Sequence, residues 1–226
     1  MVEIIPAIIP IGIRDLTYKL SQVKGVVKRV QIDIVDGRYA PKASWPFNGN
    51  DDAEFRQIKT QEKGLPFWED FEFEIDLMVK SPELIIDDWI NAGAETLIIH
   101  SGSTDDLAGI FASAKEKGVH VALALKPSAD ISLIAPFIND AAFIQVMGNN
   151  LIGENGRPLT EEALETIRVV TQTYPDATIG VDIGVNKETI GKLIEAGASR
   201  FACGSAIFDA LSVKEAIEEL KHAGVQ

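Results

Sequence analysis

Short apolar runs alternate along the chain with longer amphipathic stretches. The short runs are rich in Val and Ile, and several of them alternate polar and apolar positions with the two-residue period of a β-strand. Strands are predicted on this basis at residues 3–9, 29–35, 71–79, 95–100, 119–125, 141–147, 177–183 and 199–203. Each of these strands is followed by a stretch long enough to form a helix.

The longer stretches carry apolar residues three and four positions apart, which is typical of a helix with one buried face. Helices are predicted at residues 16–24, 51–61, 82–92, 105–117, 131–138, 161–173, 187–196 and 213–221. Thr160 and Asn186 precede two of them and suit the position that caps a helix N-terminus.

Eight strand–helix units in a chain of 226 residues predict an α/β fold, a closed (β/α)8 TIM barrel that forms a single domain over residues 1–226. A doubly wound open sheet would show a similar alternation. An open sheet gathers its polar site residues at one crossover, whereas acidic or amide residues here lie near the ends of three separated strands. The pattern therefore favours the barrel.

Carboxylates are predicted on the inner face of three strands. In the second strand the two-residue period places Gln31 and Asp33 opposite the apolar positions that would face the helices. The same period turns Asp76 and Glu74 inward from the third strand and Asp182 inward from the seventh. Burying such charges unpaired would cost several kcal/mol each, so they should meet a cation, share protons or contact solvent in a site.

Structural roles are the alternative for each of these residues. Asp33 or Asp182 could cap a loop, and Glu74 could form a salt bridge within the barrel. His100 ends the fourth strand, where it could contact a substrate or be a core histidine. Asp36 is followed by a glycine and is predicted to be a turn residue.

Glycine-containing turns follow the last two predicted strands. After the seventh and eighth strands of a barrel, backbone N–H groups beside a helix N-terminus often bind phosphate. We expect Gly184, Gly204 and Ser205 to form such a phosphate site, with Gly156 from the loop after the sixth strand. This loop could fold over a ligand, and the alternative is an ordinary surface loop.

Charge and composition limit the classes of partner that we expect the protein to bind. The formal net charge is -13, which opposes binding to nucleic acid or to an anionic membrane surface but allows a single phosphate held by N–H groups. One cysteine, Cys203, excludes an internal disulfide. Residues 1–6 lack the pattern of a signal peptide, so we expect a cytoplasmic protein.

Six stretches resemble the ribulose-phosphate 3-epimerase family in their order and spacing along nearly the whole chain. They are Pro6-Ala7-Ile8-Ile9, Gln31-Ile32-Asp33-Ile34-Val35-Asp36-Gly37, Glu74-Ile75-Asp76-Leu77-Met78-Val79, Ala124-Leu125-Lys126-Pro127, Val181-Asp182-Ile183-Gly184-Val185 and Gly204-Ser205-Ala206-Ile207-Phe208. The resemblance implies a ribulose-phosphate-binding barrel that interconverts ketopentose 5-phosphates through a metal-stabilised enediolate. It also implies that Asp33 and Asp182 are the acid/base pair.

Several positions depart from the family pattern. The resemblance implies two histidine metal ligands, and their positions are occupied by Gln31 and Asp76. The resulting ligand set, completed by Asp33 and Asp182, contains only oxygen donors and suits Mg²⁺ or Mn²⁺ better than Zn²⁺. The alternative is that no metal binds.

Three further residues are expected to contact the substrate: Ala7, Met78 and Met147. Ala7 stands where the family has a small hydroxyl residue. Core packing is the alternative for the two methionines. In addition, Ile183 replaces the first glycine of an Asp-Gly-Gly sequence.

Three functions remain open at this point. The first is an isomerase, a phosphosugar epimerase with an altered metal site. The second is another isomerase or a lyase on the same barrel, in which Lys126 could act as an amine nucleophile. The third is a non-catalytic protein that binds a phosphorylated metabolite. In each case we expect a small phosphorylated sugar as the ligand and a homo-oligomer as the assembly.

Overall fold

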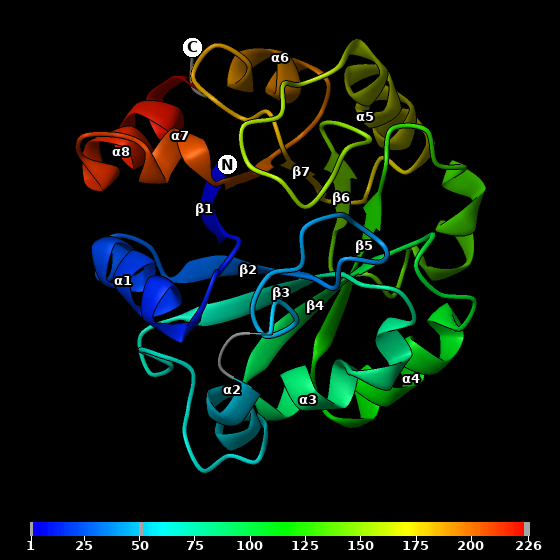
Figure 1. The fold of residues 1–226 in the computed structure, drawn as a ribbon. Helices are drawn as coiled ribbons and strands as arrows, with labels where there is room; N and C mark the ends of the chain where they lie inside the picture. Colours follow the sequence, from blue (N-terminus) through cyan, green and yellow to red (C-terminus); the bar gives the residue numbers. More distant parts are fainter. Residues whose placement is uncertain (1, 50–51, 224–226) are drawn as a thin grey trace.

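Eight parallel strands close into a barrel, and the helices surround it (Figure 1). The structure is a computed structural model and describes residues 2–49 and 52–223. Each strand pairs with the next along the chain, and β1 pairs with β8 to close the sheet. The predicted (β/α)8 fold is therefore confirmed.

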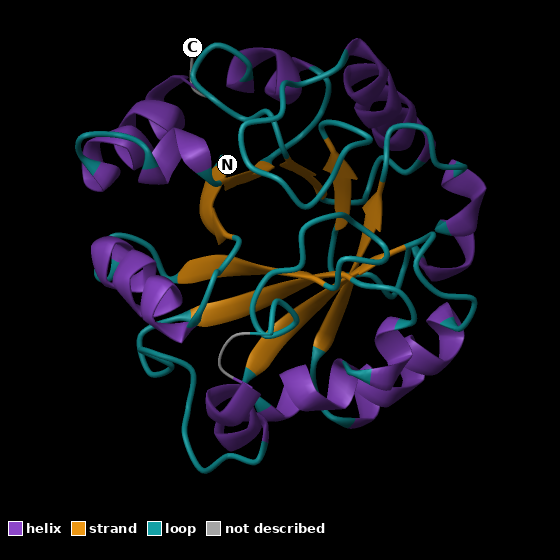
Figure 2. Cartoon of the chain, viewed as in Figure 1, coloured by secondary structure: helices purple, strands orange, loops and turns teal. Residues whose placement is uncertain are grey.

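The strands form the inner wall, drawn in orange in Figure 2. In chain order they are β1 (Glu3–Ile8), β2 (Arg29–Val35), β3 (Glu72–Met78), β4 (Ala94–His100), β5 (His120–Leu125), β6 (Ile144–Met147), β7 (Ile179–Asp182) and β8 (Arg200–Cys203). All eight lie at predicted positions, and most ends agree within one or two residues.

The helices form the outer layer. They are α1 (Ile13–Val23), α2 (Asp52–Lys59), α3 (Ile86–Asn91), α4 (Leu107–Glu116), α5 (Glu161–Thr173), α6 (Ile190–Glu195), α7 (Ser205–Phe208) and α8 (Val213–Ala223), with short 3-10 helices η1 (Pro82–Leu84), η2 (Ile131–Leu133) and η3 (Ala135–Phe137). Among the described residues, no helix has both the length and the apolar character needed to cross a membrane.

The helix predicted at residues 131–138 is wrong as a continuous element. Two 3-10 turns, η2 and η3, replace it, and Pro136 lies within the second. Proline lacks the N–H that a continuing helix needs, and its ring clashes with the preceding turn. The helix predicted at residues 51–61 is described from Asp52, and Asp51 lies outside the described residues.

Apolar and polar side chains of β2 lie on opposite faces of the sheet. Val30, Ile32 and Ile34 belong to the large apolar core between strands and helices. Gln31 and Asp33 alternate with them and lie buried on the inner face. The predicted strand parity is thus confirmed, and it places polar side chains inside the barrel.

Two arginines balance the acidic residues near the strand starts. Arg29 pairs with Glu3 and Glu72, each at 2.7 Å, and its Nε lies 3.3 Å from Glu74. Arg200 pairs with Glu3 at 2.6 Å and also with Glu74. Because Glu74 is 2% exposed, these pairs keep a buried carboxylate compensated. The salt bridge weighed as the structural role of Glu74 is therefore confirmed.

Loss of Arg200 should destabilise the barrel. We expect Arg200→Met to lower the free energy of unfolding by about 3 kcal/mol, because it leaves Glu74 buried with a weaker partner. Urea denaturation measures the change. The matched control is Lys187→Met, which removes a cation paired with Glu219 where both side chains are more than 60% exposed. It should cost less than about 0.5 kcal/mol, and equal losses in the two variants would contradict this interpretation.

Candidate functional site

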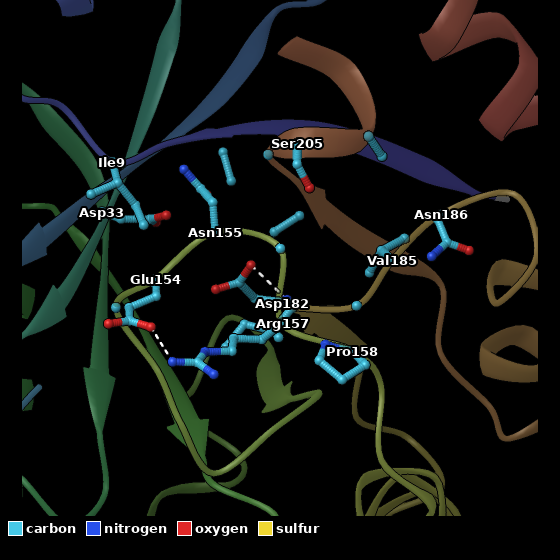
Figure 3. A pocket seen from close by; sticks show the side chains of 18 of the residues that line it. Ile9, Asp33, Glu154, Asn155, Arg157, Pro158, Asp182, Val185, Asn186 and Ser205 are labelled. Atoms are coloured by element: carbon cyan, nitrogen blue, oxygen red, sulfur yellow. Dashed lines mark hydrogen bonds and ion pairs between the residues drawn. The ribbon is translucent and has the colours of Figure 1, made fainter. Parts of the chain in front are cut away.

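A cavity of about 490 Å³ opens at the carboxyl ends of the strands (Figure 3). Asp33 and Asp182 lie in its wall, at the ends of β2 and β7. The turns after β7 and β8 and the loop at residues 148–160 complete the lining. This end of the barrel is where parallel strands deliver side chains from distant parts of the chain to one point.

Three carboxylates meet beneath the cavity. One oxygen from each of Asp33, Asp76 and Asp182 lies within 4.8 Å of the others, and the three residues are 4%, 0% and 7% exposed. Asp33 and Asp76 are register partners on β2 and β3, which places them at the same height. The structure thus brings together the three aspartates that the sequence predicted as ligands.

Gln31 lies next to the three aspartates, in the adjacent layer of inward-facing side chains toward the strand starts. Its Nε2 donates to Asp33 Oδ1 at 2.7 Å. Its Oε1 is buried and has no hydrogen-bond partner among the described residues. A buried amide oxygen without a donor, next to three carboxylates, fits a hard divalent cation such as Mg²⁺ or Mn²⁺.

Burial and mutual repulsion raise the pKa values of the two aspartates in the cavity wall. Burial, followed by the negative charge of Asp76, raises the pKa of Asp33 to about 7. Burial, followed by the charges of Asp33 and Asp76, raises the pKa of Asp182 well above its ordinary value. Proton exchange is easiest for groups that titrate near the working pH, so Asp33 suits acid/base chemistry.

Asp76 is held by two further side chains. His100 Nε2 lies 2.9 Å from Asp76 Oδ1, and Gln145 Nε2 donates to Asp76 Oδ2 at 3.1 Å. His100 is fully buried and does not line the cavity, so it is a core histidine and not a substrate contact. Gln145 was missed in the sequence, where the signal was one polar residue between Phe143 and Met147 on the inner face of β6.

The four residues predicted to bind phosphate all line the cavity. They are Gly156, Gly184, Gly204 and Ser205. Gly184 has a φ of 74°, and a Cβ on it would lie 2.4 Å from the backbone N of Leu159. Only glycine fits this turn. The first N–H groups of α7 have no partner within that helix, which leaves donors beside Gly204.

Ile183 has a strained backbone beside this turn. Its φ is 77°, a left-handed conformation that a β-branched residue rarely adopts. The Ile183 N–H donates to Asp182 Oδ1 at 2.8 Å. The turn therefore keeps the conformation suited to glycine, and Ile183 fixes one oxygen of the aspartate before it.

The residues expected to contact substrate divide into two groups. Ala7 and Met78 line the cavity. Met147 is fully buried, pairs in register with Asp182 and lies outside the cavity lining, where it packs in the inner apolar cluster.

The predicted amine nucleophile lies away from the cavity lining. Lys126 Nζ sits 4.5 Å from the ring centroid of Tyr39, and burial lowers the pKa of the amine.

Over the cavity, Glu154 pairs with Lys42 at 2.7 Å and with Arg157. The loop after β6 is thereby tied to the loop after β2, and Glu154 and Arg157 both face the cavity (Figure 3).

Residues 3–208 match the sequence model of the ribulose-phosphate 3 epimerase family. The ribulose-phosphate 3-epimerase of Bacillus subtilis is 28% identical over 227 residues, which cover 98% of this chain and 99% of that protein. The ribulose-phosphate 3-epimerase of Schizosaccharomyces pombe is 32% identical over 151 residues, or 67% of this chain and 66% of that protein.

Solved structures share the fold at low sequence identity. The 3-hexulose-6-phosphate synthase of Salmonella typhimurium has a TM-score of 0.70 at 16% identity, and the match covers 99% of both chains. The 3-keto-L-gulonate-6-phosphate decarboxylase of Vibrio cholerae has a TM-score of 0.68 at 14% identity, covering 100% of this chain and 97% of that one.

Removing one carboxylate should stabilise the metal-free protein. We expect Asp33→Asn to raise the free energy of unfolding by about 2 kcal/mol at pH 8 in EDTA, because it removes a buried, repelled charge. The pKa of Asp33 is higher in the folded state, so its charge destabilises the fold above pH 7. The gain should shrink as the pH falls toward the ordinary pKa of aspartate. Urea denaturation at several pH values measures it.

Asp36→Asn is the matched control. Asp36 accepts hydrogen bonds from the backbone N–H groups of Arg38, Tyr39 and Lys80, each at 2.8 Å, which confirms that it is a turn residue. Its replacement should lower stability by about 1 kcal/mol. A loss of stability in both variants would show that the Asp33 charge is compensated.

Proposed function

Since the chain belongs to the ribulose-phosphate 3-epimerase family, we propose that it is an isomerase that epimerises a ketopentose 5-phosphate at C3. The observation that carries this proposal is the pair of carboxylates, Asp33 and Asp182, in the wall of one cavity. Epimerisation beside a ketone needs one group to remove a proton and another to return a proton to the opposite face.

Asp33 and Asp182 supply these two groups. They come from β2 and β7, which are separated by β1 and β8 in the closed sheet. In each direction one ionised carboxylate takes the C3 proton and leaves an enediolate, and the other carboxyl group, protonated, gives its proton to the opposite face of C3. The raised pKa values support this assignment, because one carboxyl group must carry a proton when the cycle begins.

The enediolate carries negative charge next to three aspartates. A bound Mg²⁺ or Mn²⁺ would supply positive charge to its oxygens, and Asp33, Asp76, Asp182 and Gln31 would hold that ion. Gln31 also donates to Asp33 and keeps that carboxylate directed along the cavity wall.

We assign the phosphate of the substrate to the end of the cavity formed by the turns after β7 and β8. Gly184, Gly204 and Ser205 would offer backbone N–H groups there, with Gly156 from the loop above. Binding at this end fixes the distance from phosphate to C3, which is how a remote group orients the reacting carbon.

Neither alternative function has comparable support. Lys126 lies over Tyr39 and not in the cavity lining, so it is poorly placed for a lyase that uses an amine nucleophile. A binding protein would not need two aspartates with raised pKa values in the cavity wall. The cytoplasmic location and the homo-oligomeric state remain predictions.

The acid/base pair is tested by proton exchange. In D2O with ribulose 5-phosphate and Mn²⁺, the wild type should incorporate deuterium at C3. Asp33→Asn and Asp182→Asn should each reduce the rate about 10³-fold, because each removes one proton carrier. NMR measures the exchange. Asp140→Asn, at an exposed position between β5 and β6, is the control and should keep the wild-type rate. Exchange that survives in Asp33→Asn would contradict the assignment, and wild-type protein that binds phosphate without exchange would favour the binding protein.

The phosphate site is tested with inorganic phosphate. A Cβ on Gly204 would lie 3.0 Å from Asn155 Oδ1, so a larger side chain would enter the space between this turn and the loop after β6. We expect Gly204→Leu to abolish most of the rise in Tm that phosphate gives the wild type. Gly191→Leu is the control, because nothing lies within 4 Å of a Cβ there. Equal protection of both variants would place the phosphate elsewhere.

A further inference from the structure

Asp76 has a hydrogen bond at each of its carboxylate oxygens. Both of its oxygens accept one, from His100 at 2.9 Å and from Gln145 at 3.1 Å. Asp33 accepts a hydrogen bond from the side chain of Gln31, and Asp182 accepts from the backbone N–H of Ile183 and interacts with the side chain of Gln31. Side chains of two other strands therefore hold both oxygens of Asp76 in place.

The two donors reach Asp76 from the neighbouring strand and from across the barrel interior. His100 comes from β4 and Gln145 from β6, and the strand between them, β5, contributes the small residues Ala122 and Ala124 to the inner apolar cluster. The register partner of Gln145 on β7 is Gly180. Small side chains on both flanks leave the space that the long amide needs, so the interior is built to admit this contact.

Electrostatics explains why donors are needed at this position. Asp76 is fully buried, and its charge opposes those of Asp33 and Asp182 less than 5 Å away. Two N–H donors stabilise the negative charge of a carboxylate and fix its orientation. A carboxylate has about four lone-pair sites, so two hydrogen bonds leave others free to bind a cation.

We propose that His100 and Gln145 are positioning residues for a divalent cation, since they hold Asp76 as the third carboxylate ligand beside Asp33 and Asp182. This inference rests on the proposed function, because it assigns the residues that orient the metal site of that reaction. Hydrogen bonds to a ligating carboxylate fix its orientation, and their loss typically weakens metal binding about 10–100-fold.

Mn²⁺ binding tests the inference without any turnover. Titration of the full chain, followed by calorimetry and by the electron paramagnetic resonance spectrum of bound Mn²⁺, should show one site in the wild type. Gln145→Met keeps the side-chain length and removes the donor, and His100→Phe keeps the ring and removes the donor. Each should weaken Mn²⁺ binding about 10–100-fold. His100→Gln, which keeps an N–H donor, should restore part of the affinity.

Controls separate positioning from a general loss of structure. Thr96→Val removes a buried polar group from the inner face of β4, two layers below His100, and should keep the wild-type Mn²⁺ affinity. All variants should keep the wild-type rise in Tm with inorganic phosphate. If His100→Phe does not fold, Gln145→Met still decides the question.

The Mn²⁺ titrations distinguish failure of the positioning role from failure of the proposed function. Wild-type affinity in Gln145→Met, or in Asp76→Asn, overturns the positioning role while the proposed epimerase stands. A wild type that binds no Mn²⁺ overturns both the metal site and this inference, and C3 exchange then shows whether the acid/base pair works alone. Weakened binding in both donor variants, with intact phosphate protection, supports the inference.

Discussion

Charge balance inside the barrel decides what chemistry each end of the barrel can carry. Near the strand starts, Arg29 and Arg200 compensate the buried carboxylate of Glu74. Near the strand ends, no lysine or arginine of the described residues pairs with Asp33 or Asp182. An unpaired buried charge costs several kcal/mol, so this end of the barrel must hold protons or a cation. The uncompensated charge that lowers the stability of the fold also suits this end of the barrel to proton transfer.

Strand parity explains why much of the site could be predicted from the sequence. The period of two is a property of the backbone, so Asp33 and Asp182 had to lie opposite the apolar faces of their strands once those strands were recognised. The turn at Gly184 was also recognisable, because this glycine lies between the seventh predicted strand and the helix after it, and its φ of 74° in the structure explains why glycine is needed there. Local rules were therefore sufficient for the barrel, for both cavity-wall aspartates and for the turns.

Contacts across the barrel could not be predicted in the same way. The bond from Gln145 to Asp76 joins residues 69 positions apart, and its length depends on barrel diameter and on the small residues of β5. The same limit applies to Met147, which shares the register of Asp182 but packs in the inner apolar cluster and does not line the cavity. Parity determines the face of a strand, whereas packing determines which side chains touch.

Contacts among interior side chains from several strands explain how the barrel accommodates the departures from the family pattern. The family resemblance implies imidazoles at the positions of Gln31 and Asp76, so this chain has an amide and a carboxylate where neutral nitrogen donors are expected, and the buried carboxylate needs support. His100 and Gln145 provide it from two other strands, within a barrel whose backbone register is unbroken at β2, β5 and β6. A closed barrel allows such an exchange because its stability comes mainly from the apolar layer outside the strands, so interior side chains can change the chemistry without changing the fold.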